Sequence, residues 1–308
     1  MSPAAVTAFA PASVGNVAVG FDLLGHAIEG PGDRVSVGRA DQPGIRIIGI
    51  SGVVVDLPLE TRRNTAARAV RALMDYLGSD AGLEIEIEKG IPLGSGLGGS
   101  AASAVAAVMA ASKLLETGLE PTELYPFALA GEAVASGGIH GDNVGSQLIG
   151  GLVLATRERL VPVPVPAGLT AIVVHPEHMV ETRAARLALQ QSYELSEFVH
   201  QSSNLALVLA GCFRNDISLI RAGLKDLIIE PRRAHLIPGF QAVKQAALDH
   251  GALGASISGA GPAVFGWFAD SRAARRAGEA MTAAFGDVGL AARAYVSPVD
   301  APGARIEG

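Results

Sequence analysis

The feature that most constrains the fold of this chain is a glycine-rich segment, PLGSGLGGSAAS, at residues 92–103. It follows LEIEIE at residues 83–88, where apolar and acidic side chains alternate strictly. Such alternation predicts a strand with one buried and one solvated face. The small residues after the glycines, through about residue 115, predict a helix. The glycines therefore join a half-exposed strand to the beginning of a helix.

A glycine loop at the beginning of a helix is suited to binding phosphate. The glycines at 94, 96, 98 and 99 leave backbone N–H groups unobstructed, and the positive end of the helix dipole points toward the loop. Ser100, at the expected helix start, can cap the helix, bind a metal ion through its hydroxyl, or do both. Without further motifs, a tight turn with no ligand would explain the loop about equally well.

Two better-known glycine-loop folds fit less well. Residues 94–99 formally match the GxGxxG pattern of dinucleotide-binding folds. However, the strand before the loop is charged on one face, whereas the corresponding strand of a dinucleotide fold is buried on both faces. No second hydrophobic strand ending in an acid follows the helix. A Walker A loop is also excluded, because no Lys-Ser or Lys-Thr pair follows the glycines.

The remaining elements predict an α+β fold in two domains. After the proline-rich VPVPVP at 161–166, the order is strand, helices, paired strands, helix and strand. We therefore expect an N-terminal domain at 1–160 and a C-terminal domain at 167–308, although such prolines are equally typical of an edge strand. We also expect a short strand at 6–10 ended by Pro11, a loop at 136–151 and a helix at 195–222.

Composition narrows the classes of partner and compartment. The formal net charge is −6 and no long basic run occurs, which argues against a nucleic-acid partner. No apolar run is long enough for a membrane span, and the N-terminus lacks the pattern of a signal peptide. A single cysteine, Cys212, and 7 scattered histidines predict neither a disulfide nor a zinc site. These features favour a cytoplasmic protein.

Three segments together resemble the motifs of the GHMP kinases, a family named after galactokinase, homoserine kinase, mevalonate kinase and phosphomevalonate kinase. IPLGSGLGGSAAS is similar to the central motif, Pro-x-x-x-Gly-Leu-Gly-Ser-Ser-Ala-Ala, with Gly99 in place of its first serine. PASVGNVAVGFDLLG and GASISGAGPAVFGWF resemble the two flanking motifs. The wording NVAVGFD, with EAVASGGIHGDNVGSQLIGG, TRAAR at 182–186 and EPRR at 230–233, is typical of the branch that acts on homoserine.

The resemblance implies a fold and a reaction. The N-terminal half would be like ribosomal protein S5 domain 2 and the C-terminal half ferredoxin-like, with a substrate cleft between them. The chain would be a kinase that uses ATP and Mg²⁺ to phosphorylate L-homoserine on the route to threonine, and it would form a homodimer. A mevalonate-type member of the family and a catalytically silent member remain alternatives.

The resemblance also implies which residues bind the nucleotide and the metal. Asn64 would meet adenine, although a helix N-cap explains it nearly as well. Ser100 and Glu132 would bind Mg²⁺, which prefers a few oxygen ligands and keeps several waters. The residues around the phosphates would be Pro92, Gly94, Ser95, Gly96, Leu97, Gly98, Gly99, Ser100, Ala101 and Ala102.

The remaining implied site residues come from both halves of the chain. Asn16 and Asp22 would bind the amino and hydroxyl groups of the substrate, and His140 would lie beside them. Thr182 and Arg186, one helical turn apart, would share a face toward the site. Arg186 and Arg233 would bind the substrate carboxylate, near Gly259. Asp22 is not assigned as a general base, because this branch is expected to rely on transition-state electrostatics.

Overall fold

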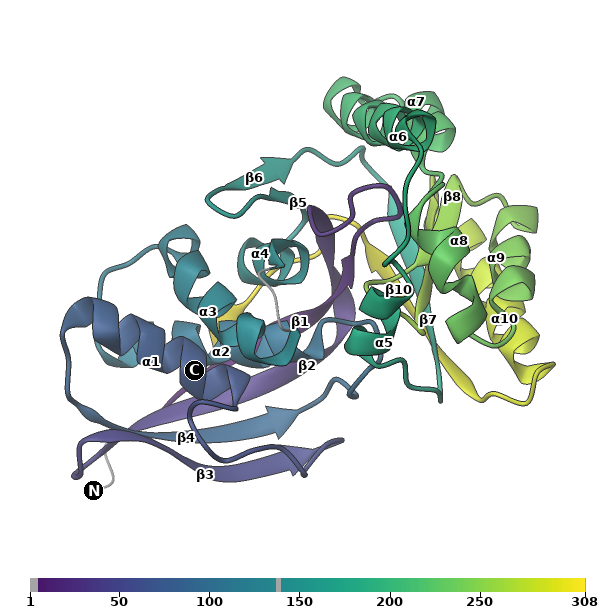
Figure 1. Ribbon diagram of the computed structural model, residues 1–308. Helices are drawn as coiled ribbons and strands as arrows, with labels where there is room; N and C mark the ends of the chain where they lie inside the picture. Colours follow the sequence, from purple (N-terminus) through teal and green to yellow (C-terminus); the bar gives the residue numbers. More distant parts are fainter. Residues whose placement is uncertain (1–4, 137–139, 308) are drawn as a thin grey trace.

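The computed structural model describes residues 5–136 and 140–307, and its N-terminal half is built on a seven-stranded sheet (Figure 1). The strands β1 (Val6–Gly15), β2 (Leu24–Ala40), β4 (Gly82–Lys89) and β3 (Gly44–Gly52) lie side by side in that order. β5 (Leu152–Ala155) pairs with β2 and with β6 (Leu160–Val163), and β11 (Arg305–Glu307) pairs with β1. Only the β3–β4 pair among these is parallel.

Helices cover one face of this sheet (Figure 1). They are α1 (Thr65–Leu77), α2 (Gly99–Leu114), α3 (Tyr125–Ser136), which follows the short 3₁₀ turn η1 (Pro121–Leu124), and α4 (Gly141–Ile149). α2 lies centrally, and its alanines are buried over much of its length. Along β4 the leucine and isoleucines are buried and the glutamates are not, which confirms the strand with one solvated face.

The C-terminal half contains a four-stranded antiparallel sheet in the order β10-β7-β9-β8. Its strands are β7 (Thr170–Pro176), β8 (Gly254–Ile257), β9 (Val264–Phe268) and β10 (Ala292–Pro298). α9 (Phe240–Asp249) and α10 (Ser271–Gly286) pack on one face over a separate apolar cluster. This βαββαβ order is the ferredoxin-like topology that the resemblance implied.

The other face of the second sheet packs against the first half. Ala171, Val173, Phe265 and Trp267 belong to the same core cluster as the buried residues of β1, β2 and α2. The linking region between β7 and α9 contains α5 (Thr182–Leu187), α6 (Leu195–Arg214), α7 (Ile217–Gly223), α8 (Ile229–Arg233) and η2 (Ala234–Leu236). The two halves therefore share an apolar core where they meet.

The structure corrects several expectations about elements. β1 does not end at Pro11: it continues to Gly15, with a register shift between Pro11 and Ser13 that accommodates the missing N–H. Most of the expected loop at 136–151 is the helix α4, although residues 137–139 of that segment lie outside the described residues. The expected helix at 195–222 is two helices, because Asn215 adopts a left-handed conformation at φ 53° and ends α6.

Two further strand pairings involve residues near the expected domain boundary and near the end of the described residues. β6 extends the N-terminal sheet to Val163, so the proline-rich segment begins as an edge strand. β11 brings residues 305–307 back to pair with β1. Within the described ranges, no helix is long and apolar enough to cross a bilayer.

Candidate functional site

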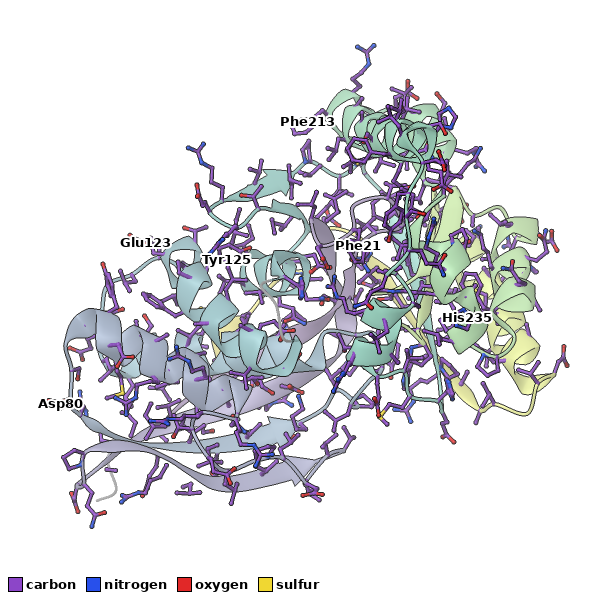
Figure 2. The ribbon with its side chains drawn as sticks, viewed as in Figure 1. Phe21, Asp80, Glu123, Tyr125, Phe213 and His235 are labelled. Carbon is purple, nitrogen blue, oxygen red and sulfur yellow. The ribbon has the colours of Figure 1, made fainter. Side chains whose placement is uncertain are left out.

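A cavity of about 210 Å³ lies between the two halves of the molecule. Figure 2 labels Phe21 at this junction. The cavity is lined by most of the residues that the sequence singled out, which come from loops and helix ends of both halves. They are Asn16, Asp22, Pro92, Gly94, Ser95, Gly96, Gly98, Gly99, Ser100, Glu132, His140, Thr182, Arg186, Arg233 and Gly259.

The glycine loop is held in one conformation by contacts from both halves. Gly94, Gly96 and Gly98 have φ angles of 58°, 77° and 71°, which glycine adopts with little cost. The Ser258 hydroxyl donates to the Gly96 carbonyl at 2.7 Å, and the Ala263 N–H donates to the Ser95 carbonyl at 3.2 Å. The loop therefore has a preformed shape at the N-terminus of α2, where phosphate is favoured.

Ser100 lies in the first turn of α2 but does not cap it. The N-cap is Gly98, which has no side chain to accept a hydrogen bond from the first turn. The Ser100 hydroxyl instead interacts with Glu132, a buried carboxylate on α3. Ser100 is therefore not the N-cap of α2, and its role in binding a metal ion stays a prediction.

Glu132 is a carboxylate in a setting that disfavours its charged form. Burial raises its pKa to about 7, with a further contribution from Asp142, and the hydrogen bond with Ser100 only partly opposes this. A divalent cation at this position would offset the unfavourable burial of negative charge. One carboxylate and one hydroxyl are hard oxygen donors of the kind that Mg²⁺ accepts, so these residues fit that ion.

Asp142 is a cavity residue that the sequence interpretation missed. Its carboxylate accepts the N–H of Asn16 at 2.9 Å, across 126 positions of sequence. Burial, together with the nearby Asp22, raises the pKa of Asp142 to about 6. The segment HGDN was recognised, but an aspartate beside glycine is usually a turn former, and only the tertiary fold brings it to Asn16.

Asp142 anchors a strained turn that carries the substrate-side residues. Asn16, Val17 and Ala18 have φ angles of 67°, 40° and 58°, and a left-handed β-branched residue such as Val17 is a true outlier. The Asn16 side chain donates to the Gly259 carbonyl at 2.8 Å and accepts the Asp22 N–H at 3.0 Å. These bonds hold the turn against the C-terminal half and set the direction of Asp22.

Asp22 forms a two-pronged ion pair with Arg186 of α5. The two terminal nitrogens of Arg186, Nη1 and Nη2, each donate to one carboxylate oxygen of Asp22 at 2.7 Å. Nδ1 of His140 lies 3.3 Å from the same carboxylate. Burial by itself raises the pKa of Asp22, but the contacts with His140 and Arg186 outweigh it and lower the pKa to about 2. Asp22 is therefore anionic and a weak proton acceptor near neutral pH.

Arg233 is a buried cation whose guanidinium contacts backbone carbonyls. It donates to Ala185 at 3.0 Å and to Gly259 at 3.1 Å, and it lies over the Phe21 ring, as Arg186 does. Burial, with the nearby Arg186, lowers its pKa to about 10, so it remains charged at neutral pH. Among the described residues, no carboxylate is within ion-pair distance of Arg233, which leaves its charge available to an anion in the cavity.

Four of the predicted nucleotide residues do not line the cavity. Leu97, Ala101 and Ala102 are buried behind the loop, where they support it. Asn64 caps α1: its side-chain oxygen accepts the N–H groups of Ala66 and Ala67, and its amide donates to Pro58. The lining residues that the sequence interpretation did not include are Leu93, Ala135, Asp142, Asn143, Val180, Ala260 and Gly261.

The cavity thus combines three chemical environments. The glycine loop and the N-terminus of α2 suit phosphate, Ser100 and Glu132 suit a divalent cation, and Arg233 suits an anionic group next to the Asp22–Arg186 pair. An acid and a base placed side by side can receive a zwitterion. The arrangement therefore matches transfer of a phosphoryl group to a small amphoteric molecule.

Comparisons with known proteins agree with this chemistry. The family models "GHMP kinases N terminal domain" and "GHMP kinases C terminal" match residues 64–151 and 208–287. A homoserine kinase of Xanthomonas campestris pv. campestris is 59% identical over 299 residues, which cover 97% of this chain and 93% of that protein. The crystal structure of homoserine kinase from Cytophaga hutchinsonii has a TM-score of 0.95 at 43% identity and covers 98% of this chain and 97% of that chain.

A more distant structure shares the fold alone. The crystal structure of L. major mevalonate kinase in complex with R-mevalonate has a TM-score of 0.68 at 17% identity. The alignment covers 94% of this chain and 95% of that one. The expected two-domain α+β architecture is therefore confirmed by both close and distant similarity.

Proposed function

The chain belongs to the GHMP kinase family, and on that premise we propose that it transfers the γ-phosphoryl group of ATP to the side-chain hydroxyl of L-homoserine. The product is O-phospho-L-homoserine, an intermediate of threonine biosynthesis. The observation that carries the proposal is the similarity to homoserine kinases along nearly the whole chain. The cavity supports it, because it is lined by the buried cation Arg233 and by the Asp22–Arg186 ion pair.

The glycine loop is the proposed phosphate site. Its backbone N–H groups and the positive end of α2 would bind the phosphates of ATP, and Leu97, Ala101 and Ala102 would support the loop from behind. Gly99 in place of the usual serine removes one hydroxyl and leaves Ser100. The contact of Asn64 with adenine stays a prediction. In the structure, the oxygen and the nitrogen of its side-chain amide form hydrogen bonds within the protein.

Ser100 and Glu132 would hold Mg²⁺ together with the phosphates. When bound, the ion neutralises charge on the transferred phosphoryl group. The carboxylate of Glu132 has to be ionised for this role, although burial raises its pKa. Glu132 would be stabilised in its ionised form by a cation held between it and Ser100.

L-homoserine would lie across the junction of the two halves. Its carboxylate would bind Arg233, with Arg186 shared between the substrate and Asp22, and its ammonium group would bind Asp22 beside His140. Asn16 has one amide hydrogen left after its bond to Gly259, and this would orient the acceptor hydroxyl. Thr182, on the same face of α5 as Arg186, would border the transferred phosphoryl group.

The catalytic contribution of the protein would be positioning and charge stabilisation. Asp22 is poorly suited to remove the hydroxyl proton, because its contacts with His140 and Arg186 keep its pKa near 2. The proton can instead leave with the phosphorylated product, whose phosphate oxygens are more basic. The reaction then needs no dedicated base.

Other expectations about the protein remain proposals. The N-terminal and C-terminal domains would meet near residues 160–167 and the protein would be cytoplasmic, as the composition indicated, and it would be homodimeric, as the resemblance implied. A small polar substrate, without nucleic acid or membrane, is the expected partner.

The experiment that tests the function is an ADP-release assay with MgATP and a panel of acceptors. L-homoserine should be used with a much higher kcat/KM than mevalonate, galactose or shikimate. A preference for mevalonate would favour another branch of the family. Absence of turnover with every acceptor, in a protein that binds MgATP, would indicate a catalytically silent member.

A further inference from the structure

A buried network of Asp33, Lys89 and Ser103 lies directly beneath the glycine loop, and the proposed reaction does not use it. The side chains of Lys89 and Asp33 are 2% and 0% exposed and form an ion pair. The Lys89 ammonium also donates to the Gly99 carbonyl at 2.7 Å and to the Ser103 hydroxyl at 2.9 Å. All three of its N–H donors are therefore occupied by protein acceptors.

The network contacts the chain at both ends of the glycine loop. Asp33 accepts the N–H groups of Gly90 and Ile91, at 3.0 and 3.2 Å, where the chain leaves β4 and enters the loop. Lys89 binds the carbonyl of Gly99, where the loop enters α2. Ser103, one turn further along α2, donates to Asp33 at 2.7 Å and closes the network.

The bond to Gly99 also determines the direction of the next backbone N–H. In a planar trans peptide the C=O and the following N–H point in opposite directions. Gly99 is the first residue of α2, and Lys89 donates to its carbonyl at 2.7 Å, so the N–H of Ser100 in the same peptide group is held in the opposite direction, in the first turn of the helix, where Ser100 lines the cavity. One side chain thus orients a donor of the proposed phosphate site.

Two other roles for Lys89 fit the structure less well. Direct contact with phosphate would require the ammonium group to leave three protein acceptors, and the side chain is almost fully buried. A purely stabilising role is weakly supported, since a buried ion pair often contributes little net stability relative to apolar residues of the same size. Asp33 also cancels the charge of Lys89, which limits any long-range attraction of phosphate.

We propose that Lys89 is a positioning residue of the nucleotide site, which acts with Asp33 and Ser103 to fix both ends of the glycine loop. The inference rests on the proposed function, because it assigns MgATP to that loop. It predicts that the network controls affinity for the nucleotide and leaves recognition of the amino-acid substrate largely unchanged.

The C-terminal half contains a network of similar chemistry that serves as a matched control. Lys244 of α9 forms an ion pair with Glu230, and the Ser256 hydroxyl donates to the same carboxylate at 2.7 Å. Glu230 is buried, as Asp33 is. These residues lie outside the glycine loop and do not line the cavity. Removing this second ion pair tests how far loss of a buried charge pair alone affects the nucleotide site.

The test compares two paired substitutions, each of which removes both charges. In Asp33→Asn with Lys89→Met, the asparagine oxygen can still accept the N–H groups of Gly90 and Ile91, while the bond to Gly99 is lost. The control is Glu230→Gln with Lys244→Met. Calorimetric titration with MgATP gives Kd, steady-state kinetics give the two KM values, and thermal unfolding gives the stability of each variant.

We expect the first pair to weaken MgATP binding about tenfold or more, as for loss of a charged hydrogen bond, with a much smaller change in the KM for L-homoserine. The control pair should keep the wild-type Kd for MgATP. If the first pair does not fold, Ser103→Ala, which removes one acceptor of Lys89, should still weaken MgATP binding about threefold.

Unchanged MgATP affinity in the variants of the first network would overturn the inference. So would an equal loss of MgATP affinity in the control pair, because that would make general destabilisation the cause. If the wild-type protein itself binds no MgATP, the proposed function fails as well. These outcomes separate failure of the inference from failure of the function.

Discussion

Arg233 and Glu132 are two buried residues of opposite charge type that line the cavity. Arg233 remains a cation without a carboxylate partner among the described residues, whereas Glu132 is an acid whose pKa burial raises to about 7. Burial disfavours the charged form of each side chain, and a ligand of opposite sign offsets that cost. Arg233 therefore suits a carboxylate, and Glu132 suits a cation.

Replacing Arg233 by Ala should raise the KM for L-homoserine with a smaller effect on kcat, if the carboxylate is held equally in ground and transition states. Loss of a desolvated charged contact costs roughly 2 to 5 kcal/mol, which is about 30-fold or more in kcat/KM. Replacing Arg233 by Lys should retain only part of kcat/KM, because an ammonium group cannot form the two parallel hydrogen bonds that the planar guanidinium makes to a carboxylate. The measurement uses L-homoserine and its methyl ester: wild type should strongly prefer the free acid, and a variant that keeps this preference would contradict the role.

Replacing Glu132 by Gln should abolish most turnover and yet stabilise the protein at pH 8. The pKa of Glu132 is raised in the folded state, so between about 4.5 and 7 the folded state binds more protons than the unfolded one. The free energy of unfolding of the wild type therefore falls as pH rises through this window. The Gln variant does not titrate here, so it should avoid this decrease of roughly 1 to 3 kcal/mol. Thermal unfolding at pH 5 and pH 8 measures this change in stability. Steady-state kinetics should show a kcat that is about 100-fold lower.

If the Glu132→Gln variant kept wild-type kcat at saturating Mg²⁺, Glu132 would be removed from the metal site. Loss of both activity and thermal stability at pH 8 would instead indicate a folding defect. A lower kcat together with a higher thermal stability at pH 8 is expected only if the ionised carboxylate contributes to activity and destabilises the folded protein.

At the scale of elements, the glycine loop offers a matched pair of positions. Gly98 has φ 71° at the start of α2, and a Cβ there would lie 2.5 Å from the Ser13 hydroxyl oxygen. Gly118 has the same φ of 71° after α2, and among the described residues other than its chain neighbours no atom lies within 4 Å of a Cβ. The backbone cost of Ala, about 1 to 2 kcal/mol, should therefore be similar at both.

Gly98→Ala should reduce MgATP affinity by about 100-fold or more, because the loop has to shift to admit the methyl group. Gly118→Ala should lose a similar amount of stability and keep wild-type affinity. Calorimetry with MgATP compares the two. Equal affinities would mean that the glycine loop only connects β4 to α2.

The glycine loop, β4 and α2 could be predicted from local glycine chemistry and from strict alternation along a strand, whereas most of the cavity lining was implied by the resemblance to the GHMP kinases. The sequence did not predict α4, whose small and polar residues, Gly141 to Ser146, have weak local helix preference and gain their order from packing. It also missed Asp142, since its bond to Asn16 joins segments far apart in the chain. From the sequence alone, Asn64 fits both an adenine contact and a helix N-cap, and in the structure it is the N-cap of α1.

At the scale of the whole molecule, the contact between the halves contains a reporter group. Trp267, the single tryptophan of the chain, donates from its indole N–H to Nε2 of His26 at 3.2 Å. His26 is completely buried on β2, and burial lowers its pKa from 6.5 to about 4, although a hydrogen bond to the Ala27 carbonyl opposes this. The neutral ring is therefore part of the interface.

Acidification should weaken this interface between about pH 6.5 and pH 4. In that window the unfolded state binds the proton of His26 and the folded state does not, so stability falls as pH falls. Glu132 and Asp142 act in the opposite direction over an overlapping range. The difference in unfolding free energy between wild type and His26→Gln isolates the histidine. Followed by Trp267 fluorescence, this difference should shrink on acidification, and a constant difference would contradict the assignment.

We have proposed that the cavity binds MgATP and L-homoserine together, so that the γ-phosphoryl group passes to the side-chain hydroxyl. The most direct test is phosphorus NMR of the products formed from L-homoserine, ATP and Mg²⁺. We expect one new phosphate-ester signal, coupled to the protons of the terminal side-chain carbon, in equal amount to ADP. Formation of ADP with only inorganic phosphate, or an ester formed on mevalonate but not on homoserine, would contradict it.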